Sequence, residues 1–459
     1  MNSKKVVTNI SIFLLVFLLG LIGIEYAFRA MIFSDKEAFK KFRDPWAYAD
    51  MDSEDLFWKL YTRWIGVYKP PECPHPLLGW IGDFSRHSLM HWRFDSFESK
   101  RPVLLYGDSF AICSGLSTCF QTILNDDSAF SQQNYLYNYG VGGYGVDQIY
   151  LLFDKTYKSF EKPFVIFSLL TFDLDRSILH FRTGQKPFFE VEDDSLVLKG
   201  VPINSNPEEY LDANPTRTIS YLWRKFLYSK ENFLPKKTVD KLKGTNRYTR
   251  KKIEVNEKIL LKTLNELREN NIEFVFVIFH TLQYDRDNYT AEEENDWRNV
   301  FLKNFLEENK VPYIWTRDLI LNDTTFDKFD ISKYILGEDG HPTTYFNTLI
   351  AEEMKRVVLA SPAKLEERRQ NDDLRKEQIF SGERYGNVDV GPTDKNFFDY
   401  HLQYYKDYLY LHERLALIDA AVYKQLKVKS DTMGVSMDHT LRNNAMWRIY
   451  EKEKNCIQK

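Results

Sequence analysis

The sequence has little cysteine and no excess of charge of either sign. Only 4 of its 459 residues are cysteine, so it is not a small scaffold that depends on disulfide cross-links. Lys and Arg total 62 against 66 Asp and Glu, and the formal net charge of −4 provides no global field for nucleic acid. The chain also lacks internal repeats and low-complexity tracts. A chain of this length and composition is expected to bury a substantial core.

The few cysteines leave the redox compartment open. Cys113 and Cys119 are 6 residues apart. On one continuous helix that separation spans about 9 Å, which is too far for a disulfide, so we expect no bond between them. Cys73 and Cys456 have no partner that the sequence identifies.

The longest uncharged run lies near the N-terminus. Residues 6–24, "VVTNISIFLLVFLLGLIGI", contain 19 residues without a charge before Glu25. A helix needs about 20 such residues to cross a bilayer. The following "EYAFRA" has bulky and charged residues where a cleavage site needs small ones, and no lipobox-type cysteine is present. We therefore predict an uncleaved membrane anchor over residues 1–30.

The orientation of this anchor is less clear from the charges that flank it. Lys4 and Lys5 precede the run, and a larger set of basic residues follows it: Arg29, Lys36, Lys40, Lys41 and Arg43. A literal count of positive charge would keep the rest of the chain in the cytoplasm. A short basic tail before an apolar run is, however, the layout of an export signal, and long domains cross despite nearby charge. We expect an extracytoplasmic domain, either periplasmic or at the cell surface.

From residue 101 onwards, apolar runs of strand length alternate with helical patterns. The expected strands are 103–106, 164–172, 274–279 and the shorter 311–315. The expected helices are 251–270, 292–309 and 343–359. This alternation predicts an α/β fold with a mostly parallel sheet covered on both faces. In such a fold, ligands bind at the carboxyl ends of the strands.

The domain boundaries follow from changes in pattern along the chain. We expect a lead-in over 31–74, the α/β domain over 75–360, and a linker with a helical extension over 361–459. Inside the domain, residues 188–203 predict a β-hairpin that turns at Asp193 and Asp194. Together with an irregular insertion over 204–250, it would form a cap at about 176–250. The basic run from Lys236 to Lys252 in that insertion predicts a solvated loop.

One short stretch places a serine where an expected strand gives way to a helix. It is "LLYGDSFAICSG", residues 104–115, and the serine is Ser109. Gly, Asp and Ser are common in any turn, so this stretch alone is as well explained by an ordinary turn. A nucleophilic serine would also need a base, a carboxylate that orients the base, and amide donors for the developing oxyanion.

Two further stretches contain residues of those types. "GEDGHPTTYFN", residues 337–347, places His341 just after Glu338 and Asp339, and an acid there can reach back to the ring across the glycine turn. "YNYGVGGYGVDQI", residues 137–149, contains 4 glycines, which permit close approach of the backbone to a ligand. Taken singly, residues 337–347 are explained by an ordinary helix start and residues 137–149 by a tight turn.

Together the three stretches resemble the SGNH (GDSL-type) hydrolase family, in particular its membrane-anchored bacterial branch. The resemblance covers roughly residues 75–358, and Gly107-Asp108-Ser109 matches the first block of the family. It implies a three-layer α/β/α sandwich, like that of flavodoxin-type folds. It also implies acyl-transfer chemistry that uses no metal and no cofactor. The rival Gly-x-Ser-x-Gly motif of α/β-hydrolases fails because residue 111 is alanine.

The resemblance also assigns roles to individual residues. It makes Ser109 the nucleophile, His341 the general base, and Gly143 an oxyanion donor beside the N–H of Ser109 itself. Members of the family carry the acid either two or three residues before the histidine. Asp339 is therefore the implied acid, and Glu338 is the alternative.

The third block of the family is altered in this chain. The family places an Asn before an Asp after the next strand, as a further oxyanion donor, whereas "SLLTFDLDRS" has Phe172 before Asp173. The Thr171 hydroxyl is a candidate replacement for that donor. We expect Asp173, Asp175 and Arg176 to stabilise a turn at the end of the strand, with a substrate role for Asp173 as the less favoured alternative.

Three functions fit these features. The first is a serine esterase that removes acyl groups, acetyl above all, from an extracytoplasmic glycan or a small ester. The second passes the acyl group to a polysaccharide or cell-wall hydroxyl, which would call for a membrane acyl-donor protein as partner. The third is a glycan-binding or scaffold protein on a decayed hydrolase fold. None of them involves nucleic acid.

Overall fold

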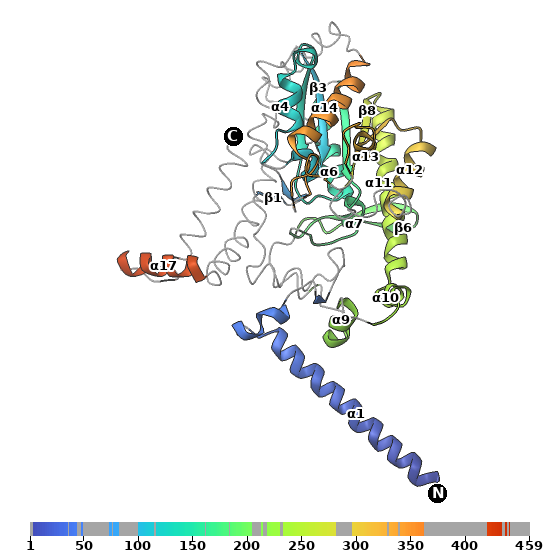
Figure 1. Ribbon diagram of the computed structural model, residues 1–459, viewed down its shortest axis with the longest axis vertical. Helices are drawn as coiled ribbons and strands as arrows, with labels where there is room; N and C mark the ends of the chain where they lie inside the picture. Colours follow the sequence, from blue (N-terminus) through green and yellow to red (C-terminus); the bar gives the residue numbers. More distant parts are fainter. Residues whose placement is uncertain are drawn as a thin grey trace. The chain divides into compact units, whose positions relative to one another are not determined.

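The computed structural model describes most of residues 3–48, 73–81, 100–280, 296–361 and 420–440, with short gaps that include 204–212, 214–217 and 338–339. The described chain divides into two compact units. The first contains residues 1–69 and 207–248, and the second contains residues 70–206 and 249–459. Figure 1 shows the elements of each. Each unit is treated by itself below.

The second unit is built on a five-stranded parallel sheet with the order β4-β3-β5-β8-β9. The strands are β3 (Arg101–Gly107), β4 (Asn134–Gly140), β5 (Phe164–Leu170), β8 (Glu273–Phe279) and β9 (Tyr313–Trp315). The order reverses between β3 and β5, which is the switch point where open α/β sheets bind ligands. The α/β class predicted from the sequence is confirmed.

Side chains of each strand alternate between two hydrophobic cores, one on each face of the sheet. In β3, Leu104 and Tyr106 enter the first core, whereas Val103 and Leu105 enter the second. The first core is covered by α6 (Val146–Thr156), α11 (Thr245–Glu269) and α12 (Trp297–Glu308). The second is covered by α4 (Phe120–Asp126), α5 (Ser128–Ser131), α13 (Thr316–Leu321) and α14 (Thr344–Leu359). The expected three layers are therefore present (Figure 1).

Two antiparallel hairpins accompany the sheet. The first pairs β1 (Cys73–His75) with β2 (Gly79–Ile81). The second pairs β6 (Phe188–Glu192) with β7 (Ser195–Lys199), and it turns at the two aspartates that the sequence predicts. Asp193 and Asp194 have φ of 47° and 63°, so both occupy the left-handed region that a two-residue hairpin turn needs.

The insertion expected to be irregular contains two helices among its described residues. It contains α9 (Tyr221–Tyr228) and α10 (Lys236–Lys243). Ser220 caps α9 by accepting from the N–H of Trp223, and Gly244, at φ 74°, ends α10. The solvated loop expected at Lys236–Lys252 is therefore wrong, because this run forms α10 and the start of α11.

The first unit also contains the apolar N-terminal segment as one continuous helix, α1 (Ser3–Ile32). Its residues Thr8–Ile32 are long enough to cross a membrane, and their most apolar window of 18 residues has a mean hydropathy of 2.3. A short 3-10 helix, Glu37–Arg43, follows in the expected lead-in. Of the linker and helical extension expected over 361–459, the structure describes α17 (Ala420–Met433) and a few single residues, and the rest lies outside the described residues.

The prediction that Cys113 and Cys119 cannot pair is wrong, because they form a disulfide with a Cα–Cα distance of 5.6 Å. That prediction assumed a continuous helix between them. The helix that contains Ser109, α3 (Ser109–Ile112), instead ends after one turn. Cys113 then turns the chain at φ 67°, which brings the two residues within bonding distance.

Candidate active site

Ser109 begins α3, directly after the carboxyl end of β3. Asp108 caps this turn, because its carboxylate accepts the N–H of Phe110 at 2.8 Å. Gly140, at the end of neighbouring β4, lets α3 approach closely, since a Cβ there would lie 2.5 Å from the backbone nitrogen of Ile112. Ser109 is half-buried, so its side chain lies at the boundary between core and solvent.

Behind the serine turn lies a buried charge cluster centred on Arg176. Its Nη1 donates to Asp108 at 3.2 Å, to Asp173 at 2.5 Å and to the carbonyl of Tyr144 at 2.9 Å. Asp173 also accepts the N–H of Leu170 at 2.8 Å. Burial and the nearby Asp108 carboxylate raise the pKa of Asp173, and the guanidinium opposes that rise. Asp173 and Arg176 therefore bind one another at the end of β5, and the expected role of Asp173, Asp175 and Arg176 in stabilising the turn there stays a prediction.

The glycine-rich loop passes beside the serine. A Cβ on Gly142 would lie 3.9 Å from the Cβ of Ser109, so this residue faces the serine turn. Gly143 has φ 81°, a conformation that other residues adopt only with strain. The loop then enters α6 at Val146. The expected proximity of the serine turn and the glycine loop is therefore present in the structure.

The peptide between these glycines is held by Trp80, on β2. The indole Nε1 donates to the carbonyl oxygen of Gly142 at 3.0 Å, and Trp80 is 4% exposed. In a trans peptide the carbonyl and the following N–H point in opposite directions. The N–H of Gly143 therefore points away from the indole, and the tryptophan fixes the orientation of this N–H.

Further contacts fasten the same loop from behind. The hydroxyl of Tyr144 donates to the carbonyl of Trp80, and Gln148 Nε2 donates to the carbonyl of Leu78 at 2.8 Å. Within α6, the Asp147 carboxylate forms a fully buried ion pair with Lys186. Burial raises the pKa of Asp147 to about 6, although the ammonium beside it opposes this rise. These contacts attach the loop to the β1–β2 hairpin and to the segment before β6.

His341 lies in the loop between α13 and α14. The N–H of Leu336 donates to the carbonyl of His341 at 2.8 Å, and Thr343 N donates to the carbonyl of Tyr334 at 2.9 Å. The imidazole packs on the ring of Phe110, with a centroid distance of 4.8 Å. Since Phe110 directly follows Ser109, the structure brings the expected base to the serine turn. Glu338 and Asp339 lie outside the described residues.

Asp323 stabilises the loop that contains His341 through several hydrogen bonds. Its carboxylate accepts from the hydroxyls of Tyr334 at 2.8 Å and Tyr345 at 2.6 Å, and from Thr325. These hydrogen bonds lower the pKa of Asp323, with the bond from Tyr345 contributing most. The carboxylate therefore stays ionised at neutral pH and joins residues on both sides of His341.

The disulfide loop connects the serine side of the site with the histidine side. Thr118 N donates to the Thr344 hydroxyl at 2.9 Å, and Asn347 Nδ2 donates to the carbonyl of Thr118 at 2.9 Å. Thr344 and Asn347 lie in the first turn of α14, which begins three residues after His341. The loop that Cys113 and Cys119 close therefore ties α3 to the helix that follows the histidine.

Thr171 and Phe172 follow β5, next to the serine strand. Thr171 is buried, and its N–H donates to the carbonyl of Phe279 at 3.2 Å. Phe172 packs under the guanidinium of Arg298, whose Cζ lies 4.7 Å from the ring centroid. An aromatic ring therefore occupies the position where the family carries its asparagine. The role of Thr171 as a replacement donor stays a prediction.

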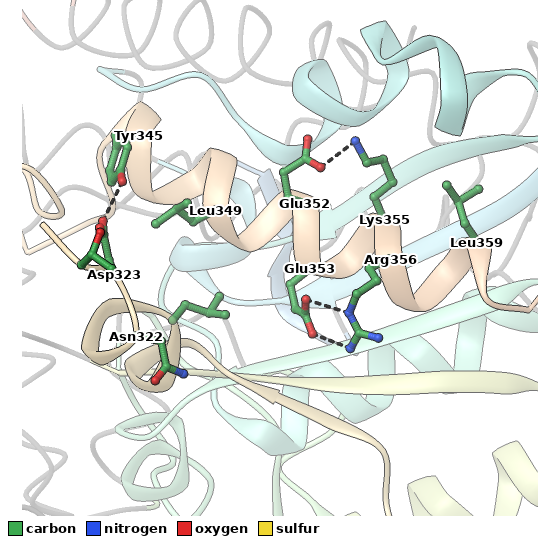
Figure 2. Close-up of a pocket in the computed structure, with 11 residues that line it drawn as sticks. Asn322, Asp323, Tyr345, Leu349, Glu352, Glu353, Lys355, Arg356 and Leu359 are labelled. Carbon is green, nitrogen blue, oxygen red and sulfur yellow. Dashed lines mark hydrogen bonds and ion pairs between the residues drawn. The ribbon is translucent and has the colours of Figure 1, made fainter. Parts of the chain in front are cut away.

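A hollow of about 740 Å³ lies between α13 and α14, and neither Ser109 nor His341 lines it. Figure 2 shows its charged residues already paired within α14, Glu352 with Lys355 and Glu353 with Arg356. Because its ionic groups are satisfied by one another, this hollow is not the candidate active site.

Comparisons with known proteins give only distant structural similarity. No known family profile and no curated protein sequence matches the chain. It is similar in structure to a putative lipolytic protein of the G-D-S-L family from Desulfitobacterium hafniense, with 12% identity and a TM-score of 0.31 over 56% of this chain and 99% of that one. Axe2, an acetylxylan esterase from Geobacillus stearothermophilus, has 13% identity and a TM-score of 0.30 over 56% of this chain and 94% of Axe2. A Lactobacillus plantarum protein has 13% identity and a TM-score of 0.31 over 57% and 98%.

At these identities and TM-scores the structural likeness is slight. The fold and the candidate site define an α/β/α sandwich with a serine turn, a glycine loop and a histidine loop at one edge of its parallel sheet.

The Trp80 contact generates a prediction about rate. In Trp80→Phe, the Gly142 carbonyl loses its donor, so the Gly143 N–H is no longer held in one orientation. We expect ester hydrolysis, and the rate at which a fluorophosphonate modifies Ser109, to fall by up to the ~100–1,000-fold typical of a lost oxyanion donor. KM should change little, because the substitution leaves the rest of the site in place.

The control is Trp315→Phe, on β9, where the tryptophan is half-buried. Its thermal unfolding midpoint and rates give the cost of a generic Trp-to-Phe change. Equal rates for the two variants at equal unfolding midpoints would contradict a positioning role for Trp80.

Proposed function

We propose that this protein is a membrane-anchored serine esterase of the SGNH type, which removes acyl groups from a carbohydrate or small ester. The observation that carries the proposal is the packing of the His341 ring on Phe110, with a centroid distance of 4.8 Å, beside the serine turn. Residues from β3, the glycine loop and the loop after β9 meet there, and these are the parts that a serine nucleophile requires.

In the proposed reaction, the Ser109 hydroxyl attacks the ester carbonyl and passes its proton to His341. The N–H groups of Ser109 and Gly143 stabilise the negative charge that develops on the carbonyl oxygen. His341 then gives its proton to the leaving alcohol, and an acyl-enzyme remains. Water, activated by the same imidazole, releases the acyl group, while Asp339 holds the imidazole in the required tautomer.

The rate of such an enzyme should depend on the number of donors in its oxyanion hole. Phe172 stands where the family has its asparagine, so the site operates with two backbone donors unless the Thr171 hydroxyl supplies a third. Losing one donor costs about 100–1,000-fold in rate in other serine hydrolases. The rigid support of the glycine loop by Trp80 is consistent with a greater dependence on Gly143.

We further propose that the catalytic unit is exported and acts on an extracytoplasmic glycan or ester, acetyl groups above all. The apolar α1 supports anchoring, because its exposed run is long enough to span a bilayer. The Cys113–Cys119 disulfide supports export, because such bonds persist in oxidising compartments and are rare in the cytosol. The charges that flank α1 favour no single orientation, so the disulfide is a separate argument for export.

The nucleophile is tested by active-site labelling. A fluorophosphonate probe should label the full-length protein once, and Ser109→Ala should abolish both labelling and ester hydrolysis. His341→Ala should prevent labelling because the hydroxyl then keeps its proton. Ser195→Ala, which changes an exposed serine on β7, is the matched control and should label normally. Folded wild-type protein that does not react would favour the scaffold function instead.

The choice between the two candidate acids is tested by their isosteric amides. Asp339→Asn should lower kcat by about 10⁴-fold, as when the acid of a serine protease triad is replaced, because the wrong imidazole tautomer is then favoured. Glu338→Gln should change kcat little. Steady-state hydrolysis of an activated acetate ester measures both. The reverse order of the two effects would transfer the role to Glu338.

The orientation is tested in intact cells. Protease added outside the inner membrane should digest the residues after α1, while an N-terminal tag should stay protected until lysis. Rapid alkylation in acid should also trap Cys113 and Cys119 in their oxidised form. Complete protection from protease together with reduced cysteines would place the catalytic unit in the cytoplasm.

A further inference from the structure

The first unit contains a sharp change in exposure along α1. Large apolar side chains are exposed from Ile10 at 53% to Ile24 at 56% and at Tyr26, at 70%, whereas Phe28 is 8% exposed and Ile32 is fully buried. The uncharged run of 19 residues spans about 28 Å at 1.5 Å per residue, close to the ~30 Å of a bilayer core. Under the proposed anchoring, the membrane boundary therefore falls at Glu25.

The start of α9 is fastened to α1 at that boundary. The Glu25 carboxylate accepts from Ser220 Oγ at 2.8 Å and from the N–H of Tyr221 at 2.9 Å. Arg29, one turn further along α1, donates to the carbonyl of Ile219 at 2.5 Å. Figure 1 shows α9 beside this end of α1. A membrane that contains α1 therefore has its surface next to α9.

Exposed apolar side chains gather on the same segment. Ile219 is 91% exposed, Trp223 47% and Phe233 83%. Trp223 and Phe233 both contact the ring of Phe226, with centroid distances of 5.5 and 5.4 Å, so they lie on one side of α9. Exposed aromatic groups at this depth are typical of a membrane interface.

The segment is also strongly basic. Residues 219–243 contain seven Lys or Arg and two acidic residues. The exposed lysines of α10 are Lys236, Lys237 and Lys241. Lys243, at the end of α10, lies 4.1 Å from the ring centroid of Tyr228, which ties α10 to α9. Basic side chains beside a membrane anchor attract anionic lipids, and interfacial aromatic groups add apolar contact.

We propose that residues 219–229 and 233–243 form a basic foot that rests on the membrane surface and binds the headgroups of anionic phospholipids. The proposal relies on the anchoring proposed above and is independent of the catalytic serine. A lipid surface fits better than a nucleic acid or a soluble acidic protein, because exposed aromatic and basic side chains occur together at the depth of the membrane boundary. The foot would fix one end of the first unit against the bilayer.

The test uses the full-length protein in nanodiscs of phosphatidylcholine alone or mixed with phosphatidylglycerol. Acylation of lysines, mapped by mass spectrometry, should fall several-fold at Lys236, Lys237 and Lys241 when the anionic lipid is added. Lys303, exposed on α12 in the second unit, is the internal control and should label equally in both lipids. Equal labelling of the foot in the two lipids would overturn the proposal.

A second measurement reads the aromatic contact. Lipids brominated near the headgroup should quench part of the tryptophan emission of the wild type, and Trp223→Phe should remove that part. Absence of a difference between the two proteins would overturn the proposal. Replacing Lys236, Lys237 and Lys241 with Gln should weaken this quenching in nanodiscs that contain phosphatidylglycerol and leave flotation with vesicles unchanged.

Failure of this proposal can be told apart from failure of the proposed function. Fluorophosphonate labelling of Ser109 in the same nanodiscs reports on the esterase and does not depend on the foot. Flotation in the presence of carbonate reports on insertion of α1. A protein that labels at Ser109 but fails to float would overturn the anchor and the foot together, and leave the esterase intact.

Discussion

One buried guanidinium holds together the three segments that form the serine side of the site. Arg176 binds Asp108 at the end of β3, Asp173 at the end of β5, and the Tyr144 carbonyl in the glycine loop. Charge-assisted hydrogen bonds in a buried setting are strong and directional. Because two carboxylates share a single guanidinium, removing it would leave buried charge without compensation, which is far more costly than losing a surface pair. The positions of the serine turn and the glycine loop therefore depend on this residue.

The rest of the site is supported by segments outside the parallel sheet. Trp80 belongs to a small hairpin, and Lys186 belongs to the segment before β6. Trp80 contacts the loop between β4 and α6 through the carbonyl of Gly142, and Lys186 contacts the adjoining α6 through Asp147. The five strands thus bring the reactive segments to one edge, and the added hairpins determine how the backbone is oriented there.

Much of the fold could be predicted because strands buried on both faces appear as continuous apolar runs. β3, β5 and β8 were predicted in this way, and β6 and β7 were predicted from the Asp193-Asp194 turn. Strand β4 was not, because its sequence alternates aromatic with asparagine residues, and both Asn134 and Asn138 are buried and hydrogen-bonded. The helical α10 was missed because its lysines favour solvent in either conformation, and local charge does not distinguish the two.

The candidate site was predicted where the chemistry is local to a motif. Ser109, His341 and the glycine loop were singled out only in combination, through their resemblance to the motifs of one family, because each stretch alone is explained by an ordinary turn or helix start. Tertiary structure determines which group the Trp80 indole contacts and how the chain runs between Cys113 and Cys119. The spacing of residues in the sequence reveals neither. The assumption of a continuous helix after Ser109 failed for this reason, since α3 ends after a single turn.

The loop after α3 that the Cys113–Cys119 disulfide closes has a consequence for how the protein matures. Thr118 and Asn347 join that loop to α14, so the disulfide braces the path between Ser109 and His341. Under the proposed function, oxidation after export would complete this brace, which would couple maturation of the protein to its arrival in the compartment of its proposed substrate.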